Sequence, residues 1–442
     1  MDIHYSNRHP SPVRPLIRER RDIAAAMSLH SLYVDLNSFF ASVEQQLCPE
    51  LRGRPVGVLP VMADTTCCIA ASIDAKRHGI KTGTPVWQAR KLCRDIVFVQ
   101  ARPSIYVEIH HRIVAAVESC TPVGAVLSID EMACDLLGSE REEARAVRLG
   151  KQIKQAIYDQ VGEMLHSSVG IAPNRFLAKT ASNMQKPDGL VVIRQHELPQ
   201  RLYGLRLGAL TGIGRAMEQR LNQIGIHSVE QLCAASKETL RHAWGGVEGE
   251  RYHARLRGEN AVPAPTRRAS VGHSHVLAPE LRDPDSAIAV LYRLLHKAAM
   301  RLRHYGYCAG GLGLHLHYLK TAAGHPRWVD QARFAPHADS LRFNPVLGEL
   351  WQRRPPDPGP LLKVGVTLTE LVEHSQATRD LFDPDDHHAA LNSVLDRINQ
   401  RYGPNTLYFG GAHHGRGAAP MRIAFSHVPE LQFDVALPHD KR

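Results

Sequence analysis

The sequence predicts an α+β fold with an inserted module, followed by a second unit behind a linker. Short β-branched and aromatic segments alternate with amphipathic helical segments through residues 28–205, and two of the strand segments carry acidic side chains near their ends. A stretch of alanine, proline and arginine at 261–270 precedes a further set of helices and strands. This mixed order of strands and helices is typical of α+β domains.

Composition sets the class of protein and favours one kind of partner. The chain has 442 residues, 43% of them hydrophobic and 22% charged, an ordinary balance for a globular protein. A formal charge of +10 favours a polyanionic partner but does not identify it. A basic protein without such a partner is the alternative that charge alone leaves open.

Cysteine, histidine and apolar patterns indicate the compartment. The eight cysteines include no Cys-x-x-Cys pair, so reduced thiols are expected. Histidines occur as adjacent pairs such as His110-His111, without the one-turn spacing of a metal site. No stretch of about twenty apolar residues could span a bilayer, and the N-terminus lacks the apolar core of a signal peptide. We expect a cytoplasmic protein that contacts no membrane.

The first half of the chain begins after a flexible lead-in at residues 1–27, where arginines and prolines show no apolar periodicity. HSLYVDLNSFFASVEQQL then predicts a strand that runs into a helix, with Asp35 at the transition. GAVLSIDEMACDLLG, at 124–138, predicts a second strand that carries Asp130 and Glu131. Between the two lie an apolar run at 56–62 and two helical segments, the second beginning at Pro85.

Two distinctive segments follow a predicted helix at 144–162. SSVGIAPNRFLAKTASNMQKPDGLVVI predicts a strand, a turn, a helix and a strand. LTGIGRAMEQRLNQIGIHSVEQL, at 210–232, has the pattern of a helix–hairpin–helix, in which Gly212, Gly214 and Arg215 surround a turn. Backbone N–H groups at such a turn can bind phosphate, although a plain turn between helices is the commoner structure.

The second unit is predicted from weaker patterns. After the linker at 261–270 we expect a helix near 286–304, strands at 309–319 and 362–369, and a helix near 388–402. A Pro/Gly-rich turn at 355–360 precedes the second of these strands. The segment from Gly410 to Pro420 is rich in glycine, alanine and histidine, so a mobile loop is expected there.

Three carboxylates are candidates for a magnesium site. Asp35, Asp130 and Glu131 are far apart in the chain but lie near strand ends, and Mg²⁺ prefers oxygen ligands of this type. Neighbouring residues of a strand point to opposite faces, so Asp130 and Glu131 can serve one site only at a bend. A solvated acidic turn is the alternative.

Together these motifs resemble the Y-family DNA polymerases, closely over residues 30–270 and loosely beyond. YVDLNSFFASVE is similar to the family's first acidic motif, SIDEMACDL to its second, and SVGIAPNRFLAKTASNMQKPDGL to its most distinctive segment. AASIDAKRHGIKTGTPV resembles its fingers and LTGIGRAMEQRLNQIGI its thumb. Each motif alone could have an ordinary structural role, but five motifs in the family's order favour the resemblance.

The resemblance implies a right hand followed by an extra DNA-gripping domain, the α/β little finger. The domain bounds that it implies are a palm at 28–54 and 97–205, small fingers at 55–96, a helical thumb with the helix–hairpin–helix at 206–260, the linker at 261–270, a little finger at 271–372 and a C-terminal extension at 373–442.

The resemblance also implies the chemistry, which is nucleotidyl transfer with two Mg²⁺ ions per site. The enzyme would add deoxynucleotides to primer–template DNA opposite damaged template, with low fidelity. It would act as a monomer. The implied metal ligands are Asp35, the Leu36 carbonyl, Asp130 and Glu131. Phe39, Phe40, Lys76 and Lys179 would bind the nucleotide, with Phe40 as steric gate against ribose. Lys186, Gly212, Gly214 and Arg215 would contact DNA, and Ser128 would shape the site. The alternative for Phe40 is an ordinary aromatic residue of the core. The alternative for Lys76 and Lys179 is an exposed lysine without a role in nucleotide binding.

This chain departs from the family pattern at four positions. Ile73 stands where a tyrosine is common, Lys76 where an arginine is usual, Asn37 where an acidic residue is frequent, and Ala133 where an aromatic residue is common. Weaker nucleotide binding is expected, because isoleucine donates no hydrogen bond and lysine lacks the bidentate fork of arginine.

The C-terminal part suggests a peptide that binds a sliding clamp, and it does not decide to which branch of the family the chain is most similar. TRDLF, at 378–382, keeps the apolar pair Leu381-Phe382 of a sliding-clamp peptide without its glutamine, so a degenerate clamp site competes with a plain loop. INQRYGPNTLYFG resembles the end of the DNA polymerase V catalytic subunit, whereas other features resemble DNA polymerase IV. A silent DNA-binding scaffold is the second functional hypothesis. A nucleotidyl cyclase with a similar palm would leave the helix–hairpin–helix unexplained.

Overall fold

The computed structural model describes residues 29–260, 267–319, 326–356, 359–377, 386–403, 405–418 and 428. The chain forms two compact units, which divide between Pro263 and Ala264, inside the predicted linker. The predicted flexible segment at 1–27 and the clamp peptide at 378–382 lie outside the described residues.

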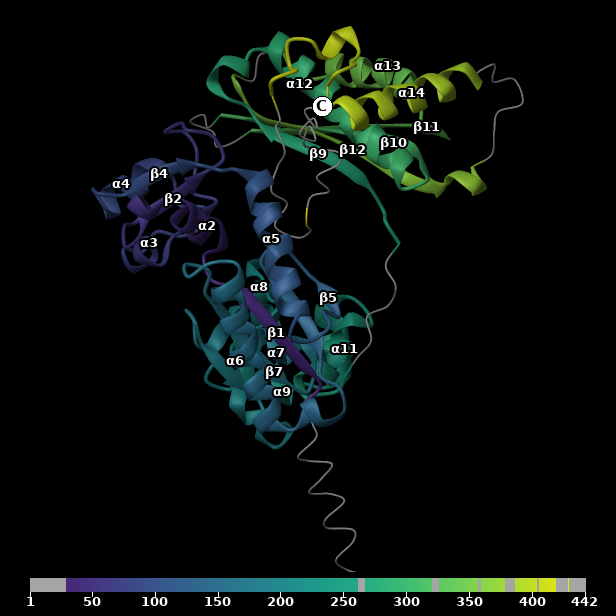
Figure 1. Cartoon of the computed structure of the whole chain (residues 1–442). Helices are drawn as coiled ribbons and strands as arrows, with labels where there is room; N and C mark the ends of the chain where they lie inside the picture. The colour runs from purple at the N-terminus through teal and green to yellow at the C-terminus, as the bar shows by residue number, and fades with distance from the viewer. Residues whose placement is uncertain are drawn as a thin grey trace, which may run out of the picture. The chain divides into compact units, whose positions relative to one another are not determined.

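A five-stranded sheet in the order β5-β6-β1-β7-β8 is the centre of the first unit (Figure 1). Its strands are β1 (Ser31–Leu36), β5 (Ala125–Val126), β6 (Glu131–Asp135), β7 (Ser167–Ala172) and β8 (Leu190–Val192). β1 pairs antiparallel with both β6 and β7, so it lies in the middle of the sheet and every one of its residues is buried. The two strands predicted to carry the acidic residues are therefore hydrogen-bonded neighbours.

Four helices of the first unit accompany this sheet: α2 (Phe39–Leu47), α5 (Pro103–Glu118), α6 (Glu143–Gln160) and α7 (Arg175–Met184). α7 starts where the Asn174 side chain accepts a hydrogen bond from the Leu177 N–H, a typical N-cap. The same side chain donates to the carbonyls of Arg255 and Glu259, which ties the start of α7 to the helical segment that follows the sheet.

The inserted module is a three-stranded sheet in the order β3-β2-β4 with two short helices. Its elements are β2 (Val56–Leu59), β3 (Ala70–Ala71), α3 (Ile73–Arg77), α4 (Val86–Leu92) and β4 (Val97–Gln100). α4 has Pro85 as its N-cap, one residue from the predicted start. A small apolar core that includes Leu59, Ile80 and Val86 holds the module together.

Short helices make up residues 207–256 of the first unit: η5 (Leu207–Ala209), α8 (Arg215–Gln223), α9 (Val229–Ala234), α10 (Lys237–Trp244) and α11 (Glu248–Leu256). The predicted glycine turn lies between η5 and α8, with Gly214 as the N-cap of α8 and Gly212 at a φ of 86°. That left-handed φ suits glycine, because a Cβ atom would be strained there. The buried Leu221, Leu232 and Leu240 pack into the same apolar cluster as α7.

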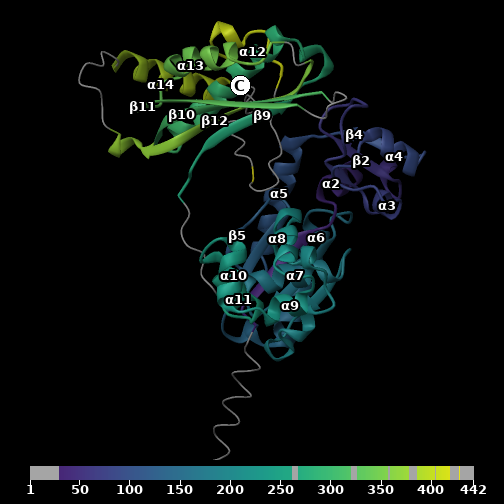
Figure 2. The ribbon, with the colours of Figure 1, turned by 180° about the vertical axis from the view of Figure 1, so that it is seen from behind.

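The second unit is a four-stranded antiparallel sheet in the order β11-β10-β12-β9, with helices on one face. Its strands are β9 (Val271–Val276), β10 (Tyr307–Tyr318), β11 (Arg327–His337) and β12 (Leu361–Glu373), and its helices are α12 (Pro284–His304), α13 (Ser340–Gln352) and α14 (Asp386–Tyr402). Figures 1 and 2 show these three helices on the same side of the sheet. The predicted strands at 309–319 and 362–369 are confirmed, whereas β9, β11 and α13 were not predicted.

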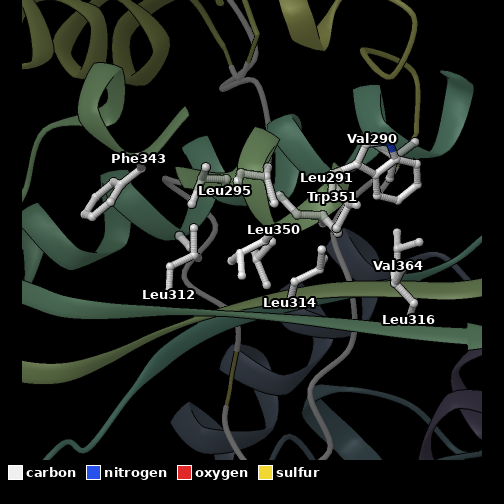
Figure 3. Packing of buried hydrophobic residues seen from close by; sticks show 14 of the residues in the cluster. Val290, Leu291, Leu295, Leu312, Leu314, Leu316, Phe343, Leu350, Trp351 and Val364 are labelled. Atoms are coloured by element: carbon white, nitrogen blue, oxygen red, sulfur yellow. The ribbon is translucent and has the colours of Figure 1, made fainter. Parts of the chain in front are cut away.

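The core of the second unit lies between α12, α13 and the sheet. Figure 3 shows Leu291 and Leu295 of α12 facing Leu312 and Leu314 of β10. All four residues are fully buried in this cluster. Helix–sheet packing of this kind buries one face of a sheet and leaves the other open.

The expected mobile loop at 410–420 is wrong for residues 410–418. These residues form η8 (Gly410–Ala412) and a turn that packs on α12, where Ala412 and Ala418 are buried. A Cβ atom at Gly415 would lie 2.7 Å from the Ala289 carbonyl, so glycine allows this close approach. The small residues that suggested mobility are instead needed for packing.

None of the described helices is sufficiently long and apolar to traverse a lipid bilayer. All eight cysteines lie in described segments, and none of them forms a disulfide there.

Candidate active site

Asp35 and Glu131 are direct cross-strand partners in the β1–β6 pair. Residues opposite each other on an antiparallel pair project to the same face, so the two carboxylates share one side of the sheet. Asp130 precedes β6 in a bend at 128–130, and its carbonyl accepts the Leu36 N–H at 2.9 Å. The bend that the sequence required for two adjacent acidic residues is present.

Two lysine ammonium groups lie among these carboxylates. Lys179 of α7 donates to Asp35 Oδ2 and, at 2.5 Å, to Glu131 Oε1. Lys186 donates to the same Asp35 oxygen at 2.6 Å. Burial lowers the pKa of Lys179, but the charges of Asp35 and Glu131 and the hydrogen bonds to them outweigh it, so the net shift is upward. The site is thus an acidic cluster whose charge is offset by cations.

Asp130 has a different set of contacts. Its Oδ1 accepts the Ser128 hydroxyl at 2.6 Å, and the role of Ser128 in shaping the site stays a prediction. Burial raises the pKa of the Asp130 carboxyl; the Ser128 hydrogen bond opposes this shift, and the charges of Glu131 and Asp35 reinforce it. A cation near Asp130 would relieve this repulsion.

Tyr33 also belongs to the site, although sequence reasoning missed it. Its hydroxyl donates to Glu131 Oε2 at 2.8 Å, and the Lys179 ammonium lies 5.0 Å from the centre of its ring. Burial, followed by the charge of Glu131, raises the pKa of Tyr33 far above its ordinary value, so the hydroxyl stays protonated. The strand alternation that places residues 33 and 35 on one face was the signal that could have identified it.

The donor set suits a hard divalent cation, because Asp35, Asp130 and Glu131 offer only carboxylate oxygens. Asp35 and Glu131 already contact one shared cationic nitrogen, that of Lys179. Within the described ranges, no three His, Cys, Asp or Glu side chains form a preassembled metal cluster. The carboxylates point to lysine and serine partners instead, so binding of metal would require Lys179 to give up contacts.

Asn37, one of the departures from the family pattern, is explained by its contacts. Its amide nitrogen donates to Ser168 Oγ at 3.0 Å, and its Oδ1 accepts the Asp188 N–H at 2.7 Å. Asn37 is 5% exposed, so both groups need partners. The Ser168 hydroxyl can also donate to Asn37 Oδ1, at 3.2 Å, so the difference that a carboxylate would make here is a second buried negative charge two residues from Asp35. Asn37 therefore holds β7 and the loop before β8 and takes no part in the acidic cluster.

Phe39 and Phe40 begin α2, directly after the Asn37-Ser38 turn, and both are buried. The Phe40 ring stacks on Tyr106 of α5, with the ring centres 4.7 Å apart. Tyr106 donates to Glu44 Oε1 at 2.6 Å. The core-aromatic alternative for Phe40 and the gate hypothesis are both compatible with this packing, so the gate stays a prediction.

Glu44 forms a buried network that sequence reasoning also missed. It lies one turn after Phe40 on α2, and its carboxylate binds the Arg102 guanidinium at 2.5 Å in addition to the Tyr106 hydroxyl. A buried carboxylate is stable only when its oxygens are satisfied in this way. Only a structure could reveal the pairing, since Arg102 is far from Glu44 in the chain.

Lys76 projects from α3 of the inserted module and is exposed. Partial desolvation and then the charge of Lys186 lower the pKa of Lys76, while Asp35 and Asp130 act in the opposite direction. The ammonium is therefore within electrostatic range of the acidic cluster. Ile73, the second departure in this helix, lies one turn before Lys76 at the start of α3.

The glycine turn lies at the start of α8, and its binding of phosphate stays a prediction. Gly214 is the N-cap of α8 and makes no side-chain cap, and Arg215 is the first residue of the helix. The N–H groups of a first helical turn have no partners within the helix and favour anions. Leu381 and Phe382, the two residues of the clamp hypothesis, lie outside the described residues.

Comparison with known proteins identifies the family. The model of the impB/mucB/samB family matches residues 34–183, and that of the impB/mucB/samB family C-terminal domain matches residues 268–381. DNA polymerase IV of Moorella thermoacetica is 33% identical over 399 residues, which cover 87% of this chain and 96% of the relative. DNA polymerase IV of Alkalilimnicola ehrlichii is 32% identical over 77% of this chain and 95% of its own length.

Solved structures agree on the fold. A Y-family DNA polymerase chimera of Dbh and Dpo4 superposes with a TM-score of 0.64 at 24% identity, covering 78% of this chain and 99% of the chimera. A structure titled an insertion ternary complex of Dbh DNA polymerase has a TM-score of 0.51 over the same shares. The predicted arrangement of palm, small fingers, helical thumb and little finger is confirmed, and the chain belongs to the Y family of DNA polymerases and resembles DNA polymerase IV.

Proposed function

We propose that this chain is a DNA-directed DNA polymerase of translesion synthesis, with its active site at Asp35, Asp130 and Glu131. The observation that carries the proposal is the pairing of Asp35 with Glu131 across β1 and β6, with Asp130 in the adjoining bend. The relatives at 32% and 33% identity are named DNA polymerase IV, and no finding favours a silent scaffold.

The family implies a requirement for divalent metal, and we propose two Mg²⁺ ions held by the three carboxylates and the Leu36 carbonyl. When bound, such ions would activate the attacking hydroxyl and neutralise charge on the leaving pyrophosphate. The protein's own contribution is to hold Asp35 and Glu131 on rigid, paired strands, which limits reorganisation during the reaction.

Lysines and aromatic rings would bind the incoming nucleotide. Lys179, with its ammonium among the carboxylates, and Lys76, on the inserted module, would bind phosphate oxygens of the deoxynucleoside triphosphate. Phe40 would exclude a ribose 2′-hydroxyl by repulsion, and the neighbouring Phe39 would complete the sugar pocket. Selection at Phe40 then depends on the ring position set by stacking on Tyr106.

Primer–template DNA would bind through cations and backbone amides. The N–H groups at Gly212 and Gly214, together with Arg215, would contact DNA phosphates without reading sequence. Lys186 would add a further phosphate contact, and the formal charge of +10 favours the polyanion. The proposed enzyme is a cytoplasmic monomer. Its fidelity would be low, because a small inserted module would make few contacts with the nascent base pair.

Primer extension tests the proposal. The full chain is incubated with Mg²⁺, deoxynucleotides and intact or lesion-bearing templates, beside the Asp130→Asn variant, which keeps the size of the side chain. Extension on both templates is expected, with at least a hundredfold loss in the variant. Asp159→Asn, on the exposed face of α6, is the matched control. Equal extension by the Asp130→Asn variant would identify the activity as a contaminant.

The clamp peptide is a separate proposal. Leu381 and Phe382 would insert into an apolar pocket of a sliding clamp. A pull-down with clamp protein that gives equal capture of the full chain and of the Leu381→Ala, Phe382→Ala double variant would remove it.

A further inference from the structure

Tyr33 lies under the acidic cluster on the same face of the sheet. It precedes Asp35 by two residues on β1, so both side chains project to the side that carries Glu131. The side chain is 2% exposed, and its hydroxyl donates to Glu131 Oε2 at 2.8 Å. Glu131 Oε1 accepts from Lys179 at 2.5 Å. The two oxygens of Glu131 therefore have different donors, one of them a fixed hydroxyl in the core.

The space for this ring comes from the strand opposite. Tyr33 is the direct cross-strand partner of Ala133, and both are buried in the cluster that also contains Leu177 of α7. Opposed side chains on an antiparallel pair lie about 5 Å apart, so a large residue at 133 would compete with the ring. The departure at Ala133 is thereby explained: the small residue leaves room for Tyr33.

Filling the core does not require the hydroxyl. A phenylalanine would bury the same ring without bringing a polar group that must find a partner. The partner found here is one carboxylate oxygen of the acidic cluster. Rotation about the last bond of a glutamate side chain has a broad, shallow profile, so a single hydrogen bond to one oxygen decides where the other oxygen points.

We propose that Tyr33 is a positioning residue, whose hydroxyl holds Oε2 of the Glu131 carboxylate, so that Oε1, which accepts from Lys179, is the oxygen that would bind a divalent cation. This inference rests on the proposed function, because it assigns Glu131 a place in the metal site. Partners that orient a metal ligand typically change metal affinity 10- to 100-fold when removed. Tyr33→Phe should therefore weaken the binding of divalent cation about tenfold while the ring still fills the core.

Two measurements on the full chain test the inference. The first is the Mg²⁺ concentration that gives half-maximal single-turnover extension. The second uses no turnover: Mn²⁺ binding is followed by electron paramagnetic resonance in a complex with a dideoxy-terminated primer, template and the next deoxynucleotide. We expect about a tenfold shift in both for Tyr33→Phe, with extension restored at high Mg²⁺ and a melting temperature close to that of the unsubstituted chain.

Tyr318→Phe is the matched control. It removes a tyrosine hydroxyl that is buried in the second unit and has no hydrogen-bond partner among the described residues. Unshifted Mg²⁺ and Mn²⁺ curves for Tyr33→Phe would overturn the inference, as would lost extension with intact Mn²⁺ binding. If the unsubstituted chain extends no primer, the proposed function fails, and the Mn²⁺ measurement still decides whether the hydroxyl orients a metal ligand.

Discussion

The Lys179 ammonium donates at once to Asp35 on β1 and Glu131 on β6, and so joins the two acidic motifs through a helix that follows both in the chain. In this state the lysine supplies the positive charge that a metal ion would otherwise supply. Cation binding and this ion pair are therefore in competition, and the competition can be measured as stability.

Lys179→Met should change how Mg²⁺ affects stability. Removing one partner of a buried ion pair leaves uncompensated charge and costs about 3 kcal/mol; Lys186 still contacts Asp35 and reduces that cost. Without Mg²⁺ the variant should melt several degrees lower, and added Mg²⁺ should raise its melting temperature more than that of the unsubstituted chain. Lys151→Met, on the exposed face of α6, is the control. An equal Mg²⁺ effect in both proteins would contradict the competition.

Phe40→Leu should relax sugar selection. The smaller side chain opens the space against which a 2′-hydroxyl would press, and it also loses the stacking on Tyr106. We expect ribonucleotide insertion relative to deoxynucleotide insertion to rise at least tenfold in steady-state kinetics. Phe98→Leu, which changes a half-buried ring packed against the core of the three-stranded module, should leave this ratio unchanged. Unaltered discrimination in Phe40→Leu would place the gate at another residue.

Asn37→Asp should destabilise the first unit by about 1–2 kcal/mol. The Ser168 hydroxyl can donate to the new carboxylate as it does to Asn37 Oδ1, so the cost comes from burying a second negative charge two residues from Asp35. Urea denaturation at neutral pH measures the free energy of unfolding. Asn222→Asp, on the exposed side of α8, is expected to change it little. A variant as stable as the unsubstituted chain would show that a second carboxylate is tolerated at this buried position.

His296 should make the second unit less stable in mild acid. Burial lowers the pKa of His296 to about 4, while the hydrogen bond that Asn344 Oδ1 accepts from His296 Nε2 opposes the shift. The unfolded chain, whose histidine pKa is near 6.5, binds more protons between those two pH values. The contribution of neutral His296 to the free energy of unfolding is therefore fully present above pH 6.5. It is lost as the pH drops towards 4, and the loss is about 2 kcal/mol at pH 5.

Urea denaturation of the second unit at pH 7 and pH 5 checks this pH dependence. His296→Gln, which cannot become charged, should flatten it. His111→Gln, on the exposed side of α5 in the first unit, is the control. The same fall in stability in His296→Gln would assign the effect to another group.

Much of the first unit could be predicted because its signals are local. The β-branched and aromatic residues of SLYVDL predict a strand, Asn174 is a strong N-cap, and Pro85 stands at the start of α4. The second unit was predicted less well: β9 contains His273 and His275, which obscure strand periodicity, and α13 has Pro345 inside it. Gly415 was misjudged because its role depends on contact with α12, which no local pattern reveals.

By itself the sequence determined which chemical groups the protein has and in what order: three carboxylates in two motifs, the lysines that follow, and a glycine turn before α8. These are properties of residue type and spacing. Tertiary structure alone decided that Glu131 faces Asp35, that Lys179 bridges them, and that the Tyr33 hydroxyl reaches Glu131. The physical reason is register: a shift by one residue between β1 and β6 would move Glu131 to the other face of the sheet, and only the packing of the whole core sets that register.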